Sequence, residues 1–195
     1  MDKVKIAIFI SGKGSNALNI IRYFRGNDAI EVALVLSNKA DSFGLEKAQK
    51  AGVNTVVFNN EAFKKNGEVD TYLRSLGVSF IVLAGFLRQI PVDLVESFKN
   101  RIINIHPSLL PKFGGKGMFG EHVHKAVLES GETESGITIH YVTNEYDEGK
   151  VIFQETVSVD EKDTVQGLIN KIQKLEHAYY PVIIEKTIHH GFNLK

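Results

Sequence analysis

Short runs of apolar, mostly β-branched residues recur through the first half of this 195-residue chain, and segments with helical spacing separate them. Such runs are typical of strands that are buried on both faces of a parallel sheet. The predicted strands are VKIAIFI (4–10), EVALVLS (31–37), VNTVVF (53–58), VSFIVLAG (78–85) and RIINIH (101–106), and the predicted helices between them are 16–24, 43–52, 65–77 and 91–98. Because strand and helix alternate, we expect a doubly wound, mostly parallel sheet with a Rossmann-like N-terminal half.

The second half of the chain departs from this alternation. After a predicted helix at 121–130, the segments 136–142 and 149–159 alternate apolar and polar residues in the manner of a hairpin. We therefore expect the sheet to end in an antiparallel C-terminal edge. The whole chain, 1–195, is predicted to be a single α/β domain, with 1–100 as its Rossmann-like half.

The last predicted helix has one apolar stripe, formed by Val165, Leu168, Ile169, Ile172 and Leu175. Asp163 or Thr164 is expected to cap it. Pro181 lies further along the same segment and is expected to kink or restart the helix, because proline lacks a backbone N–H.

Composition excludes several classes of function. The net charge is zero, so nothing argues for partners such as nucleic acid or an acidic membrane. The chain has no cysteine, which excludes disulfides and thiolate chemistry, and no apolar run long enough to span a membrane. The N-terminus has the pattern of a first strand rather than a signal peptide, so we expect a cytoplasmic protein. A metal site is disfavoured because no carboxylate spacing completes a set with the candidate ligands His122, His124 and His140.

The first chemical signal is SGKGSNA (11–17), between the first predicted strand and the first predicted helix. Gly12 and Gly14 allow a tight turn, and the helix N-terminus that follows offers N–H groups to a phosphate. The glycines also fit a dinucleotide-binding fingerprint, but the acidic residue expected after the second strand is replaced by Ser37 to Lys39. We predict a site for a single phosphate group. The alternative is a tight turn with a Ser or Asn cap and no ligand.

The second signal lies at the end of the fifth predicted strand, where Asn104 and His106 interrupt an apolar run. Residues two apart share one face of a strand, and open α/β sheets bind ligands beyond the carboxyl ends of their strands. Pro107 ends the strand, and the glycine-rich segment Lys112–Gly120 is predicted to be a mobile lid. A lone histidine is usually structural, but this pair at a carboxyl edge favours a functional site.

The third signal is Asp147, in a polar turn between the two strands of the hairpin. A turn aspartate is more often structural than catalytic. If the turn folds back over the fifth strand, however, the carboxylate can accept a hydrogen bond from His106 and favour its imidazolium form.

Six motifs carry a resemblance to a known family. They are SGKGSN, SNKADSFGLEKAQKAGV, VLAGFLR, NIHPSLLPKF, DEGKVI and LEHAYYP, in this order. Together they resemble the phosphoribosylglycinamide formyltransferases, a branch of the formyltransferase family, over nearly the whole chain. NIHPSLLP alone is less specific, because it is similar to a segment of methionyl-tRNA formyltransferase, formyltetrahydrofolate hydrolase and sugar-nucleotide formyltransferases. SGKGSN and the lack of a C-terminal domain favour the glycinamide enzymes over the tRNA enzyme, and the lack of an N-terminal regulatory segment disfavours the hydrolase.

The resemblance implies transfer of a formyl group from 10-formyltetrahydrofolate to the amine of glycinamide ribonucleotide, in purine biosynthesis and without a metal. The catalytic residues would be Asn104 and His106, which stabilise a tetrahedral intermediate, and Asp147, which assists proton transfer. The ribonucleotide would be bound by Gly14, Ser15, Asn16 and Glu176. The folate would be bound by Leu87, Arg88, Gln89, Ile90, Thr143, Asn144 and Tyr146.

The chain also departs from the family pattern. The segment 112–120 belongs to a stretch that is longer and richer in glycine than the commoner family version. No basic residue clearly matches the one that meets the folate tail, and the nearest residues are Lys64, Lys65 and Asn66. Formyltetrahydrofolate hydrolase, another folate-dependent formyltransferase, an NADP-dependent oxidoreductase that uses Lys39, and a non-catalytic nucleotide-binding module remain as alternatives. We expect small-molecule substrates, and either a monomer or a homodimer.

Overall fold

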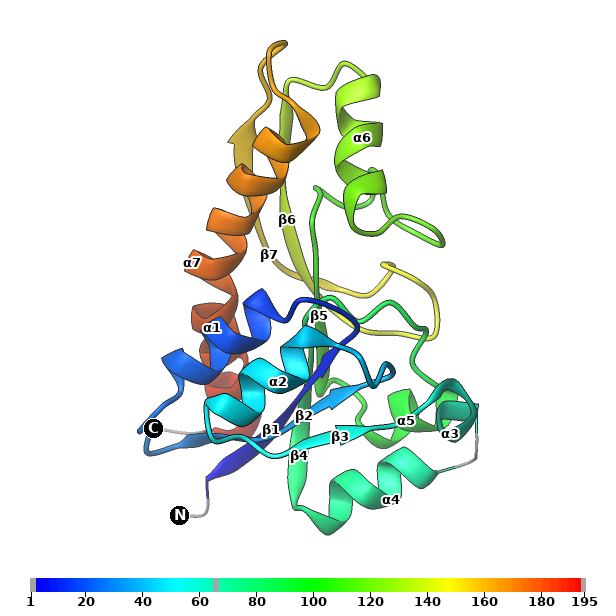
Figure 1. Ribbon diagram of the computed structural model, residues 1–195, viewed down its shortest axis with the longest axis vertical. Coiled ribbons are helices and arrows are strands. Elements are labelled where there is room, and N and C mark those ends of the chain that lie inside the picture. The colour runs from blue at the N-terminus through cyan, green and yellow to red at the C-terminus, as the bar shows by residue number, and fades with distance from the viewer. Residues whose placement is uncertain (1–2, 65–66, 194–195) are drawn as a thin grey trace.

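The computed structural model describes residues 3–64 and 67–193, which form a seven-stranded sheet in the order β3-β2-β1-β4-β5-β6-β7 (Figure 1). The strands are β1 (Val4–Ile10), β2 (Ile30–Ser37), β3 (Thr55–Val57), β4 (Val78–Leu83), β5 (Ile102–His106), β6 (Glu134–Tyr141) and β7 (Val151–Ser158). The helices are α1 (Ser15–Tyr23), α2 (Phe43–Lys50), α3 (Asn60–Lys64), α4 (Glu68–Ser75), α5 (Val92–Ser97), α6 (Glu121–Glu129) and α7 (Val165–Phe192). Two candidates for the folate-tail contact, Lys65 and Asn66, lie outside the described residues.

The sheet confirms the predicted fold class. Strands β1 to β5 are parallel, and β6 and β7 add an antiparallel edge. The chain runs outward from β1 to β3 and then returns to the other side of β1 at β4, so the strand order reverses between β1 and β4. Ligands of such sheets bind at this reversal, beyond the carboxyl ends of the strands. The register of β5 and β6 places Asn104 opposite His140 and His106 opposite Thr138.

Side chains of the central strands alternate between two apolar cores, as expected for strands covered on both faces. In β1, Ile6 and Ile8 pack into one core with residues of α1, α2, α6 and α7, whereas Ala7 and Phe9 pack into the other with residues of α3, α4 and α5. The long helix α7 runs beside α1 and over β6 and β7 (Figure 1). The carboxyl edge of the sheet is left uncovered.

The C-terminal helix continues through Pro181 as one helix of 28 residues, so the predicted restart is wrong. Proline cannot donate to the carbonyl four residues earlier, which belongs to His177. Nδ2 of Asn19 on α1 donates to that carbonyl instead, at 2.8 Å. At the other end, Thr164 is the cap, and its hydroxyl accepts from the N–H of Gly167.

Two further differences are local. The short helix α3 was not predicted, and the side chain of Asn59 accepts from the N–H groups of Glu61 and Ala62 at its start. Helix α4 begins at Glu68, inside the predicted segment 65–77. Among the helices of residues 3–64 and 67–193, none is long and apolar enough to cross a membrane.

Candidate active site

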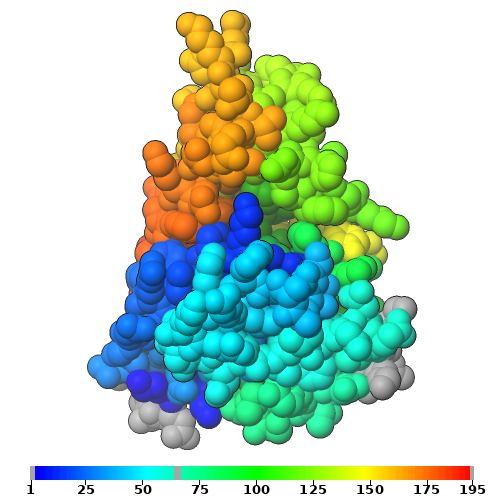
Figure 2. All heavy atoms as spheres, in the orientation of Figure 1, coloured from blue at the N-terminus to red at the C-terminus, as the bar shows by residue number. Residues whose placement is uncertain are grey.

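A cavity of about 390 Å³ lies at the carboxyl ends of the central strands. Its walls come from the loop before α1, the ends of β4 and β5, the glycine-rich loop after β5, the turn between β6 and β7, and α7. Figure 2 shows the surface hollowed where the N-terminal segment meets the chain after β5. Every site residue predicted from the sequence lines this cavity except Asn144.

The first loop, residues 12–16, forms one end of the cavity. Gly14 has a φ of 67° and leads directly into α1, whose N-terminus has no side-chain cap. The predicted alternative of a Ser or Asn cap is therefore wrong. The N–H groups of a first helical turn have no acceptor within the helix, so this end of the cavity can receive an anion.

Asn16 links the first loop to α7. Its Nδ2 donates to Oε2 of Glu176 at 2.9 Å, while its Oδ1 is buried without a hydrogen-bond partner. Burial raises the pKa of Glu176, and the bond from Asn16 opposes this only in part. Tyr180, one helical turn after Glu176, donates its hydroxyl to the carbonyl of Leu83 at 2.8 Å and so holds this part of α7 against β4.

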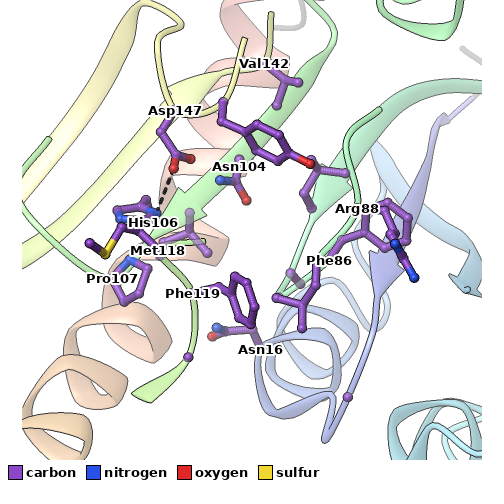
Figure 3. Close-up of a pocket in the computed structure, with 18 of the residues that line it drawn as sticks. Asn16, Phe86, Arg88, Asn104, His106, Pro107, Met118, Phe119, Val142 and Asp147 are labelled. Atoms are coloured by element: carbon purple, nitrogen blue, oxygen red, sulfur yellow. Dashed lines mark ion pairs between the residues drawn. The ribbon is translucent and has the colours of Figure 1, made fainter. Parts of the chain in front are cut away.

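His106 and Asp147 face each other, with Asn104 beside them (Figure 3). Nδ1 of His106 lies 3.5 Å from Oδ2 of Asp147, and both side chains are nearly buried. Nε2 of His106 lies 2.8 Å from the carbonyl oxygen of Phe113 and must carry the hydrogen, because a carbonyl can only accept. Burial lowers the pKa of His106 more than Asp147 raises it. The expected contact is present, but the neutral imidazole is favoured rather than the imidazolium.

Asp147 is held by three neighbours in a turn where its φ is 58°. Its Oδ2 accepts from the N–H of Gly115 at 2.9 Å, and its Oδ1 lies 3.6 Å from Nε2 of His140. Burial disfavours the charged form, but the contacts with His140, His106 and Gly115 outweigh it and hold the pKa of Asp147 below its ordinary value. The carboxylate is therefore ionised at neutral pH.

His140 is a site residue that the sequence suggested only as a disfavoured metal ligand. Its Nδ1 donates to the carbonyl of Tyr141 at 2.9 Å, so the neutral ring presents a lone pair at Nε2. Nδ2 of Asn104 lies 3.2 Å from that nitrogen and can donate to it. This orients the amide of Asn104. The position of His140 opposite Asn104 depends on strand register, which the local sequence did not reveal.

The long loop, residues 112–120, is docked onto this cluster. The carbonyl of Phe113 binds His106, and the N–H of Gly115 binds Asp147. A Cβ on Gly114 would lie 3.3 Å from Cβ of Asp147. Met118 and Phe119 line the cavity from the same loop (Figure 3). The segment predicted to be a mobile lid therefore makes specific contacts with both catalytic candidates.

The opposite wall is formed by the end of β4 and the turn after β6. Leu87, Arg88, Gln89 and Ile90 line it on one side, and Val142, Thr143 and Tyr146 on the other. Nε2 of Gln89 donates to the carbonyl of Asn144 at 2.7 Å, which joins the two segments although the side chain of Asn144 does not reach the cavity. The N–H of Leu87 donates to the hydroxyl of Ser11, so this wall is also tied to the first loop.

The remaining histidine of the cavity is His124, on α6. It is only 5% exposed, and its Nδ1 has no partner. Burial, together with repulsion from a protonated His106, lowers its pKa from 6.5 to about 4. His122 lies outside the cavity with its ring against Phe119. Across residues 3–64 and 67–193 there is no group of three or more histidine and acidic side chains that could hold a metal ion.

Comparison with known proteins gives a consistent result. The family model described as formyl transferase matches residues 4–184. A chloroplastic phosphoribosylglycinamide formyltransferase of Arabidopsis thaliana is 43% identical over 92% of this chain, which spans 64% of that relative. The phosphoribosylglycinamide formyltransferase of Haemophilus influenzae is 36% identical, with 93% of this chain and 85% of the relative covered. The crystal structure of the enzyme of that name from Bacillus halodurans superimposes with a TM-score of 0.87 at 34% identity, covering 97% of this chain and 98% of the other.

Proposed function

Because this chain belongs to the formyl transferase family, we propose that it transfers a formyl group from 10-formyltetrahydrofolate to the primary amine of glycinamide ribonucleotide. The product would be the formylated ribonucleotide of purine biosynthesis. The relatives named above are called phosphoribosylglycinamide formyltransferases, which supports this choice of substrate.

One observation carries the proposal. A single cavity joins an uncapped helix N-terminus to the polar cluster of Asn104, His106 and Asp147. A ribonucleotide substrate needs an anion site at one end and a reacting group at the other. We assign the phosphate to the first loop, through Gly14, Ser15 and the N–H groups of α1, and the ribose to Asn16 and Glu176, whose buried oxygen atoms can accept from hydroxyl groups.

The reaction builds negative charge on the formyl oxygen when the amine attacks the formyl carbon. Asn104 uses one amide hydrogen toward His140 and has a second for this oxygen. The N–H of His106 at Nε2 is shared with the carbonyl of Phe113, so the formyl oxygen would compete with that carbonyl for it. Donors aimed at such an oxygen each lower the barrier by about 3–4 kcal/mol.

Proton transfer falls to Asp147. The attacking nitrogen becomes an acidic ammonium group in the tetrahedral intermediate and must lose a proton, and the leaving nitrogen must gain one. An ionised carboxylate can accept the first proton and pass it on, directly or through water. The lowered pKa of Asp147 keeps it in that form.

The wall formed by residues 87–90 and 142–146 fits a flat, hydrogen-bonding ring. It offers apolar side chains such as Leu87 and Val142 together with exposed backbone groups. We therefore assign the folate to this wall, through Leu87, Arg88, Gln89, Ile90, Thr143 and Tyr146, with Asn144 acting only through its backbone. When bound there, the folate supplies the activated formyl group.

The hydrolase alternative would use water in place of the amine at the same cluster. We favour the transferase because the first loop gives a phosphate-bearing substrate a place to bind. The NADP-dependent oxidoreductase and the non-catalytic module are dropped, because the formyl transferase model covers residues 4–184.

An absorbance assay with 10-formyl-5,8-dideazafolate, with and without glycinamide ribonucleotide, tests the proposal. Turnover should require the ribonucleotide, and release of the formyl group without it would favour the hydrolase. Asn104→Ala should lower turnover by about 100-fold and leave both dissociation constants nearly unchanged. Ser15→Ala should weaken ribonucleotide binding and spare folate binding.

Location and assembly stay predictions. The sequence predicts a cytoplasmic protein, whereas the Arabidopsis relative is named as chloroplastic. Fractionation of the native source and light scattering of the purified chain, which the sequence predicts to be a monomer or homodimer, would test these two points.

A further inference from the structure

The N-terminal turn of α2 supports the first loop from behind. The carbonyl of Gly12 accepts from the N–H of Gly44 at 3.1 Å and from the hydroxyl of Ser42 at 2.8 Å. The carbonyl of Lys13 accepts from Nζ of Lys47 at 2.7 Å. Two successive carbonyl groups of the loop are therefore directed at α2.

This arrangement fixes where the loop's N–H groups point. The C=O and N–H of one trans peptide unit point in opposite directions. When the carbonyls of Gly12 and Lys13 face α2, the N–H groups of Lys13 and Gly14 face away from it. The loop lines the cavity and α2 does not, so the side away from α2 is the cavity side.

The loop and α2 also touch through two glycines. A Cβ on Gly14 would lie 2.5 Å from Cα of Gly44, and the φ of Gly14 is unfavourable for any other residue. A Cβ on Gly44 would overlap Cδ1 of Ile10 and lie 3.0 Å from Cα of Gly14 and 3.1 Å from the carbonyl oxygen of Gly12. The loop can hold this position only because neither residue has a side chain.

Ser42 gives an independent indication. It occupies the N-cap position of α2, where a serine hydroxyl usually accepts from an N–H of its own helix. Here the hydroxyl makes no capping bond and donates to Gly12 instead. Its contact serves the loop rather than the helix.

We propose that Ser42 and Gly44 are positioning residues for phosphate recognition: without touching the ligand, they turn the N–H groups of the first loop into the cavity. This inference rests on the proposed function, because it takes the phosphate of glycinamide ribonucleotide as the ligand. A purely structural role would affect stability and the binding of both substrates alike.

Calorimetric titration with glycinamide ribonucleotide and, separately, with 10-formyl-5,8-dideazafolate tests the proposal. Gly44→Ala and Ser42→Ala should each weaken ribonucleotide binding by about tenfold or more and change folate binding by less than about twofold. Gly191→Ala is the control for the first, since a Cβ there meets nothing within 4 Å. Ser75→Ala is the control for the second, since its hydroxyl also donates to a backbone carbonyl but lies away from the cavity. Neither control should change either affinity.

A double variant separates positioning from folding. Ile10→Val with Gly44→Ala removes the overlap with Cδ1 of Ile10 but keeps the close contacts with Gly14 and Gly12. It should recover thermal stability relative to Gly44→Ala without recovering ribonucleotide affinity. If affinity returns together with stability, or if both ligands weaken equally, the positioning role is wrong. If the unmodified protein fails to bind the ribonucleotide at all, the proposed function fails and takes this inference with it.

Discussion

The side-chain nitrogen of Asn104 lies 3.2 Å from Nε2 of His140, and the two residues are direct partners in the register of β5 and β6. The other ring nitrogen of His140 is engaged by the carbonyl of Tyr141, which leaves Nε2 as an acceptor. The histidine thus holds the amide of Asn104 in one orientation. If Asn104 donates to the formyl oxygen, His140 is the residue that aims it.

Replacement of His140 should therefore impair the chemical step more than binding. His140→Leu removes the acceptor, and we expect turnover to fall by about 10- to 100-fold with little change in either dissociation constant. His140→Gln offers a side-chain oxygen to Asn104 and should lose less. Single-turnover rates measure this, and equal losses for the two variants would contradict the orienting role.

Asp147→Asn should lower turnover strongly, because the amide cannot take a proton. It should also lower the pKa of His106 further, since the carboxylate is the main influence that raises it against burial. An NMR titration of the His106 ring follows this shift. The double variant His106→Ala with Asp147→Asn should lose less than the sum of the two single losses, because the residues act as a unit. Additive losses with an unmoved titration would make Asp147 a turn residue only.

Local patterns were sufficient to predict the sheet, because each parallel strand is a continuous apolar run and each turn carries its own glycine or proline. They also placed Asn104 and His106 on one face of β5. They could not place His140 or Gly44, since both act through segments distant in the chain. His140 reaches Asn104 through strand register, and Gly44 meets the first loop through a helix packing that no periodicity encodes.

The long loop was predicted to be a lid from its glycines alone, and its hydrogen bonds to His106 and Asp147 refine that prediction. The amide of Gly115, bound by the carboxylate at 2.9 Å, should exchange more slowly in the free protein than those of Lys116 and Gly117. Asp147→Ala should remove this difference. Amide hydrogen exchange measured residue by residue is the test, and uniformly fast exchange across 112–120 would mean that the loop is not docked in solution.

Stability should fall in acid because of His124. Its folded pKa is about 4 and its ordinary value is 6.5, so the unfolded chain binds the proton first as the pH drops. The stabilisation by this group is complete above about pH 6.5 and decreases toward pH 4, by up to about 3 kcal/mol. Urea unfolding at pH 7.5 and pH 4.5 should show this loss, and His124→Gln should reduce it. An unchanged pH dependence in the variant would show that His124 is protonated in the folded protein.

The last prediction concerns the continuity of α7. The carbonyl of His177 has no helical donor because Pro181 follows four residues later, and Asn19 supplies one from α1. Asn19→Ala should leave that carbonyl without its partner and lower the free energy of unfolding by about 1–2 kcal/mol. Pro181→Ala restores an N–H within the helix, so in that background Asn19→Ala should be nearly neutral. Denaturant titrations of the four proteins complete the cycle. If Asn19→Ala destabilises both backgrounds equally, the two residues are not coupled, and α7 passes through Pro181 for another reason.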